Sequence, residues 1–219
     1  MEQLILRFPH VTEQIFQQLE NKDLAKCREV KKLWQKFIDE RNYPWLRIVN
    51  IPTILRDGNT YMHLAALCGQ LDIFEKIIIK EENKNAKNHR GETPFLVACR
   101  KGQLNIALIL QKKADELRID LNAKDNNGWT AFHLACERGH ANVAEMFMEN
   151  LVNLSIDPNA KTNEGQTAFH LACRWGQFYL AKIFMENSAT LGINLNAKDI
   201  RGHTAFNLAC VLDNPRERS

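Results

Sequence analysis

A nine-residue motif recurs along most of this chain, and it constrains the fold more than any other feature. The stretch Gly-Trp-Thr-Ala-Phe-His-Leu-Ala-Cys at 128–136 returns with small changes at 91–99, 165–173 and 202–210. A looser copy stands at 58–66. A motif that returns every 33 to 37 residues is typical of repeat proteins, in which each unit buries its apolar surface only against its neighbours.

Local signals within each copy predict two helices joined by a tight turn. Thr130 comes just before the first helix, where its hydroxyl can accept hydrogen bonds from free backbone N–H groups. Gly139 and Gly176 fall at the turn between the helices, where glycine adopts positive φ at little cost. The segments Asn-Asn-Gly at 126–128 and Asn-Glu-Gly at 163–165 predict turn tips. The apolar faces of the second helices are supplied by Val143, Phe147, Ile183 and Phe184.

The spacing of the copies matches a known family of repeats. Their threonines stand at 60, 93, 130, 167 and 204, so the period is 33 residues once and then 37. About residues 55–213 resemble the ankyrin repeat, whose signature is T-P-L-H-x-A. The resemblance implies an all-α solenoid of helix-turn-helix units with β-turn tips. We expect a repeat domain over 57–219, with units at 57–87, 88–124, 125–161 and 162–198 and a partial fifth at 199–213.

The longer period predicts four extra residues after each second helix, around 116–119, 153–156 and 190–193. We expect them to lengthen the end of that helix or the loop that follows it.

Residues 1–50 do not carry the repeat, and their apolar spacing predicts three short helices. They contain Phe8-Pro9, Ile15-Phe16-Gln-Gln-Leu19, Asp23-Leu24 and Val30-Lys-Lys-Leu-Trp34. This pattern resembles an F-box, a three-helix unit that docks on the Skp adaptor of SCF-type ubiquitin ligases. The resemblance implies that residues 51–56 form a linker. It also implies these apolar adaptor-binding residues: Pro9, Ile15, Phe16, Leu19 and Leu24.

Binding by the repeats is expected to use the positions that differ between copies, at the turn tips and on the exposed side of each first helix. The candidate partner-binding residues are Arg90, Arg100, Lys101, Asn127, Trp129, Arg138, Glu164, Arg174, Trp175 and Arg201. Trp and Arg are enriched at interface hot spots. The alternative for Trp129 and Trp175 is that each packs on its neighbouring repeat. A basic stripe for an acidic partner is the further possibility for Arg100, Lys101, Arg138 and Arg174, although Glu92, Glu137 and Glu164 are interspersed among them.

No motif for catalysis or for a cofactor occurs in the chain, and we expect no catalytic residues, no cofactor and no metal site. His133 and Cys136 have a spacing that can hold a metal ion. The repeat explains them more simply, by an internal hydrogen bond for the histidine and a small buried slot for the cysteine. Adjacent cysteines of the motif are expected to lie too far apart for disulfides. Cys68 is expected to be the most accessible thiol.

Charge and hydropathy narrow the choice of partner. The net charge is +3, and the excess lies in residues 1–56 because the remainder holds 19 basic and 19 acidic residues. We therefore expect no nucleic-acid partner. No apolar run is long enough to span a bilayer, and reduced cysteines suit the cytoplasm, with the nucleus as the alternative.

Two functions remain open. The first is an SCF-type substrate-recognition subunit, whose partners are a Skp-type adaptor and a protein substrate, with no small-molecule substrate and no membrane. The second is an ankyrin scaffold or inhibitor in which residues 1–50 only cap the solenoid.

Overall fold

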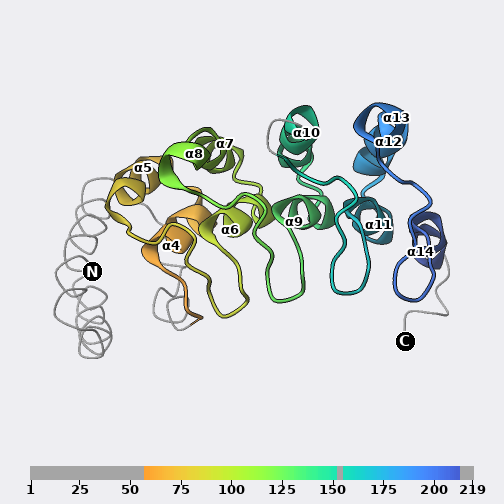
Figure 1. Cartoon of the computed structure of the whole chain (residues 1–219), viewed down its shortest axis with the longest axis horizontal. Helices are drawn as coiled ribbons and strands as arrows, with labels where there is room; N and C mark the ends of the chain where they lie inside the picture. The colour runs from red at the N-terminus through yellow and green to blue at the C-terminus, as the bar shows by residue number, and fades with distance from the viewer. Residues whose placement is uncertain (1–56, 152–154, 213–219) are drawn as a thin grey trace, which may run out of the picture.

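The repeat region folds into two rows of helices with loops extending to one side (Figure 1). The structure is a computed structural model that describes residues 57–151 and 155–212. The inner row consists of α4 (Tyr61–Cys68), α6 (Pro94–Arg100), α9 (Ala131–Glu137), α11 (Ala168–Arg174) and α14 (Ala205–Leu212). The outer row consists of α5 (Leu71–Lys80), α7 (Leu104–Lys112), α10 (Ala141–Asn150) and α12 (Phe178–Glu186).

The prediction of an all-α repeat fold is confirmed for the described residues, which contain no β-strand. The predicted N-terminal unit at 1–50 and the linker at 51–56 lie outside the described residues, and so do Pro9, Ile15, Phe16, Leu19 and Leu24.

Threonine begins the inner helices, as the motif predicts. The Thr130 side chain accepts a hydrogen bond from the backbone N–H of His133, and the Thr130 N–H is 3.3 Å from His133 Nδ1. The same reciprocal cap forms at α4 and α11. In α6 a leucine replaces the histidine, and Pro94 occupies the first helical position, where its fixed φ favours the helix. The short inner helices are therefore started in two ways, by a histidine that completes the cap in α4, α9 and α11 and by a proline in α6.

The cap histidines also join neighbouring repeats. Because Nδ1 accepts from the threonine backbone, Nε2 carries the hydrogen and donates it to a carbonyl of the next repeat. His63 Nε2 is 2.8 Å from the Glu92 oxygen, and His133 Nε2 is 3.2 Å from the Gln166 oxygen. His170 Nε2 is 3.2 Å from the His203 oxygen. Each buried neutral imidazole therefore links two repeats.

A chain of phenylalanine rings runs through the core. Phe147 lies between Phe95 and Phe132, with ring centroids 6.0 and 5.6 Å away. Phe184 lies 5.6 Å from both Phe132 and Phe169. These rings come alternately from inner and outer helices, and Phe147 and Phe184 are fully buried. The rings of the outer helices thus pack between neighbouring inner helices. The apolar spacing of the second helix of each repeat predicted this buried face.

The longer period adds a separate short helix after α7 and after α12, whereas the predicted segment at 153–156 lies partly outside the described residues. The added helices are α8 (Ala114–Leu117) and α13 (Ser188–Leu191), one directly after α7 and the other after α12. Each ends at a residue with left-handed backbone, Arg118 at φ 53° and Gly192 at φ 65°. The prediction of a longer helix or loop is thereby corrected. The backbone leaves the helical conformation at Lys113 (φ −99°, ψ 10°) and at Asn187 (φ −103°, ψ 7°), so each added turn is separate from the outer helix before it.

Candidate protein-binding surface

The turn tips are shaped by a polar side chain at the start of each turn. Asp125 Oδ1 accepts hydrogen bonds from the N–H groups of Asn127 and Trp129, both at 2.8 Å. Asp199 makes the same pair of contacts with Arg201 and His203, at 2.9 and 2.8 Å. Asn88 does so in the second repeat. A short Asp or Asn side chain replaces the missing backbone partners, which holds each tip in one conformation.

Neighbouring tips are joined by backbone hydrogen bonds. The N–H of Asn126 donates to the Arg90 oxygen at 3.0 Å, and the N–H of Asn163 donates to the Asn127 oxygen at 2.9 Å. The N–H of Ile200 continues the series to the Glu164 oxygen at 3.0 Å. We call this series the tip ladder. Because every described tip is bonded to the next, a partner meets a surface that is ordered before binding, which lowers the entropic cost of association.

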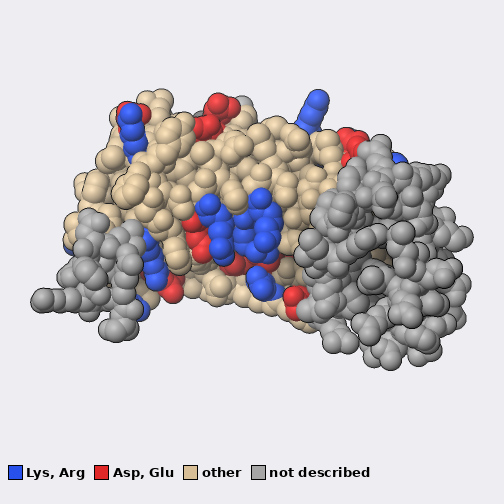
Figure 2. All heavy atoms as spheres, turned by 180° about the vertical axis from the view of Figure 1, so that it is seen from behind, with Lys and Arg blue, Asp and Glu red and all other residues tan. Residues whose placement is uncertain are grey.

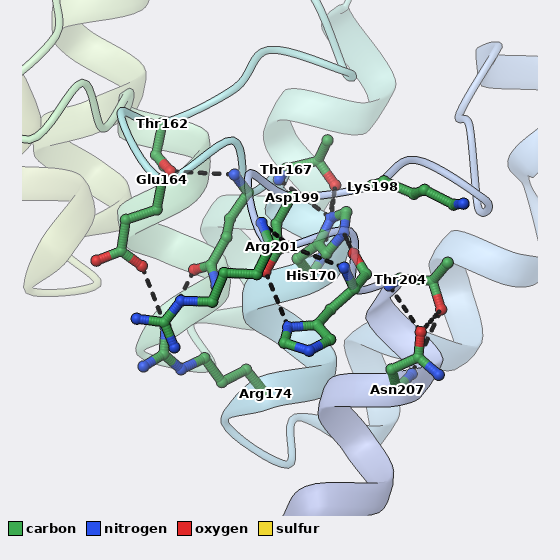
Figure 3. A network of polar contacts seen from close by, with 12 residues as sticks. Thr162, Glu164, Thr167, His170, Arg174, Lys198, Asp199, Arg201, Thr204 and Asn207 are labelled. Carbon is green, nitrogen blue, oxygen red and sulfur yellow. Dashed lines mark hydrogen bonds and ion pairs between the residues drawn. The ribbon is translucent and has the colours of Figure 1, made fainter.

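The arginines near the inner helices are paired with the interspersed glutamates. Arg100 Nε lies 2.6 Å from an oxygen of Glu92, which is buried. Arg138 Nε lies 3.1 Å from Glu137. Arg174 Nη1 lies 3.4 Å from Glu164 Oε2, at the bottom left of Figure 3. Figure 2 shows Lys and Arg side chains gathered in the middle of one face, with acidic side chains among them.

Lys101 and Arg90 are exposed and form no ion pair with any described residue. Partial burial of the Lys101 side chain lowers its pKa, and the positive charges of Arg100 and Arg138 lower the pKa further. Among the described residues, three cations, Arg90, Arg100 and Arg138, thus act on Lys101, and the one acidic residue that acts on it is the buried Glu92. We call Arg90, Lys101, Arg138 and Trp175 together the Lys101 surface.

Comparison with known families accounts for most of the described chain. The family model described as "Ankyrin repeats (3 copies)" matches residues 62–162, and the model described as "Ankyrin repeat" matches residues 164–200. The chain belongs to the ankyrin-repeat family. No F-box family matches, and no curated protein matches the chain. The predicted ankyrin repeats are thus confirmed, whereas the F-box resemblance still depends on the residues of 1–34.

The ankyrin fold presents most of the predicted partner-binding residues to solvent. Arg90, Asn127, Glu164 and Arg201 are exposed along the tips. The exposed residues Lys101, Arg138, Arg174 and Trp175 lie at the ends of inner helices. Arg100 is half-buried, and its charge is neutralised by Glu92. Its side chain is therefore placed to hold the turn rather than to meet a partner.

The two tryptophans differ in their surroundings: Trp129 packs within the solenoid, whereas Trp175 is exposed. Trp129 is half-buried and packs against the hydrophobic core. It occupies the slot that holds the buried Glu92 and Gln166 in the flanking repeats. Trp175 is 52% exposed, and the guanidinium carbon of Arg174 lies 6.0 Å from its ring centroid. Trp175 is therefore the tryptophan of this ankyrin solenoid that is free to contact a partner.

Two further aromatic side chains, which the repeat pattern did not predict as exposed, lie at the start of α12. Phe178 and Tyr179 begin α12 and are 81% and 60% exposed. The Tyr179 hydroxyl donates to Glu145 Oε1 at 2.8 Å. The same positions hold Ala141 and Asn142 in the preceding ankyrin repeat, so the departure from the repeat pattern was the signal available.

The cysteine predictions need one correction. Cys99 and Cys136 are fully buried, and burial raises the pKa of both thiols. Cys68 is only half-buried, and burial raises its pKa to about 11. Among the described cysteines Cys210 is the exposed one. The next inner helix packs against each helix that carries Cys99, Cys136 or Cys173, which helps to bury these three thiols.

The described residues contain no cluster of three His, Cys, Asp or Glu residues placed to hold a metal ion. A hollow of about 560 Å³ opens over Phe132 and Phe147, and the charged residues of its lining are Lys124, Asp157 and Lys161. No helix of residues 57–151 and 155–212 has both the length and the apolar character needed to cross a bilayer.

The close approach of the tips makes Gly165 intolerant of a side chain. Its φ is 74°, and an added Cβ would lie 2.9 Å from the backbone nitrogen of Ile200. We expect Gly165→Ala to lower the free energy of unfolding by more than the ~1–2 kcal/mol of a left-handed backbone alone. We also expect faster hydrogen exchange at the Ile200 amide, since that contact pushes the next tip away.

Gly202→Ala is the matched control for this prediction. Gly202 has φ 81°, but nothing lies within 4 Å of its added Cβ. Urea unfolding and amide exchange of both variants provide the comparison. Equal exchange at Ile200 in both would contradict a close contact between the tips.

Proposed function

We propose that this ankyrin-repeat chain is a substrate-recognition subunit of an SCF-type ubiquitin ligase. In this proposal the repeats hold a protein substrate while residues 1–50 bind a Skp-type adaptor. Catalysis belongs to other subunits of the complex, and the chain acts in the cytoplasm or the nucleus.

The tip ladder is the observation that carries the recognition half of the proposal. Ankyrin repeats act in protein–protein interaction, and here the tips are bonded to one another across the described repeats. The exposed tip residues differ from repeat to repeat, with Arg90 in one, Asn127 in the next and Glu164 in the third. A rigid row of differing side chains suits binding to one particular protein, because little freedom is lost on association.

The adaptor half of the proposal is supported by the sequence of residues 8–34. From Ile15 to Trp34 the F-box pattern is matched without a gap. In that pattern Ile15, Phe16 and Leu19 are apolar anchors for the adaptor. A protein with one binding unit at each end can bring a substrate to a ligase without any reactive group of its own.

Co-purification with a Skp-type adaptor tests the proposal. Wild-type chain is expected to retain the adaptor, and Leu19→Asp is expected to reduce the amount retained at least about tenfold, because a desolvated carboxylate opposes an apolar contact. Gln18→Asp adds the same charge at the neighbouring polar position and is expected to retain the adaptor.

Failure of the wild-type chain to retain the adaptor would contradict the proposal, as would retention by Leu19→Asp. Either outcome would favour the ankyrin scaffold or inhibitor. Deletion of residues 1–50 would then lower stability without removing a partner.

A further inference from the structure

The Lys101 surface combines unbalanced positive charge with an exposed aromatic ring. Lys101 and Arg90 have no acidic partner among the described residues. Arg138 is about half exposed beyond its contact with Glu137, and such exposed pairs contribute little. The guanidinium of Arg138 can therefore still donate to an incoming carboxylate.

The repeat places the members of this surface at a regular spacing. Lys101, Arg138 and Trp175 each cap the C-terminus of successive inner helices, which pack side by side. Packed helices lie about 8–10 Å apart. An extended chain in the polyproline II conformation advances about 3.1 Å per residue with three residues per turn, so every third side chain faces the same side and meets the next ankyrin repeat.

We propose that the Lys101 surface binds an extended acidic segment of the protein partner. Two acidic residues three positions apart face Lys101 and Arg138, and an apolar residue three positions further along packs on Trp175. Arg90 lies close enough to Lys101 to interact electrostatically with it, and it adds a second cation at the first acidic position. This inference rests on the proposed recognition function of the repeats.

The charge pattern favours a peptide over a nucleic acid. Glu137 and Glu164 lie beside the arginines, 3.1 Å from Arg138 and 3.4 Å from Arg174. A continuous phosphate backbone would meet these carboxylates as well as the cations. A peptide with carboxylates at every third residue meets only the cations.

The first measurement is fluorescence anisotropy of the full chain with labelled peptides. The probe Glu-Ser-Gly-Glu-Ser-Gly-Leu is used in this order and in reverse, with Gln-for-Glu and Ser-for-Leu versions as peptide controls. We expect one of the two orders to bind and the Gln version to bind at least about tenfold more weakly.

Protein variants then assign the contacts. We expect the double variant Lys101→Gln, Arg138→Gln to weaken binding about tenfold. We expect Trp175→Ala to weaken binding of the Leu peptide about thirtyfold while changing little for the Ser peptide. Lys112→Gln is the matched control, because Lys112 is an exposed lysine on α7, away from the surface. It is expected to leave binding unchanged.

Several results would overturn the inference: no binding of either peptide order, equal loss with Lys112→Gln, or stronger binding of a short oligothymidylate. Tighter binding of a peptide with acidic residues seven positions apart would contradict an extended segment, because that spacing suits a helical one. A chain that still retains its Skp-type adaptor but binds none of the peptides refutes this inference and leaves the proposed function standing.

Discussion

Phe184→Ala should lower the free energy of unfolding by about 3–5 kcal/mol. Phe184 is fully buried on α12, and its ring lies 5.6 Å from the rings of Phe132 and Phe169. Removing the ring leaves a cavity at the joint between two repeats. Because a repeat protein is stabilised through nearest neighbours, the loss should reach both repeats. Urea unfolding followed by circular dichroism measures it.

Phe178→Ala is the matched control on the same helix. The Phe178 side chain is 81% exposed, so its removal leaves no internal cavity. We expect a change within about 0.5 kcal/mol. Comparable losses for the two variants would show that α12 does not face the core as described.

Stability should decrease as the pH falls from about 6.5 to about 4. Burial lowers the pKa of His133 to about 4, and its hydrogen bonds to the carbonyls of Ala160 and Gln166 oppose this only in part. Below the ordinary histidine pKa the unfolded chain binds a proton that the folded chain does not. The free energy of unfolding therefore falls through this window, by roughly 3 kcal/mol for His133 alone.

His63 and His170 add to the effect in the same direction. Burial lowers the pKa of both, and both make the same cap and the same link to the next repeat. The charged groups that act on His133 are Lys124, which lowers its pKa, and Asp157, which raises it. Protonation of any of the three histidines removes the Nδ1 acceptor of the cap.

His133→Asn separates this effect from the titration of carboxylates. In the fifth repeat Asn207 Oδ1 accepts from the Thr204 N–H at 2.9 Å, so asparagine can form the cap without a titratable group. We expect the variant to be less stable at pH 7 and to lose less stability between pH 6.5 and 4. An unchanged pH dependence would show that His133 does not stay neutral in the folded chain.

Much of the repeat architecture could be predicted because its signals are local. A threonine before each inner helix, a glycine after each tip and an apolar stripe on each outer helix act within a few residues. Thr130, Gly128 and Phe147 take the predicted roles. These signals also recur, so a weak preference at one position is supported by the same preference in the other copies.

The binding surface was harder to predict because it depends on contacts between residues far apart in the chain or packed in the core. Glu92 and Trp129 occupy equivalent positions, yet one neutralises Arg100 and the other packs on the core. The repeat places Trp129 and Trp175 at different positions of the motif, but only the packed structure shows that the first position is half-buried and the second exposed.

The amino-acid order by itself determined the helix starts and the tips of the described repeats, because backbone preferences of a few adjacent residues decide these features. The tertiary structure alone decided which cations are balanced, which rings reach solvent and how the added residues after α7 and α12 are accommodated. Those outcomes follow from distances and burial between stacked units, which exist only once the units have packed together.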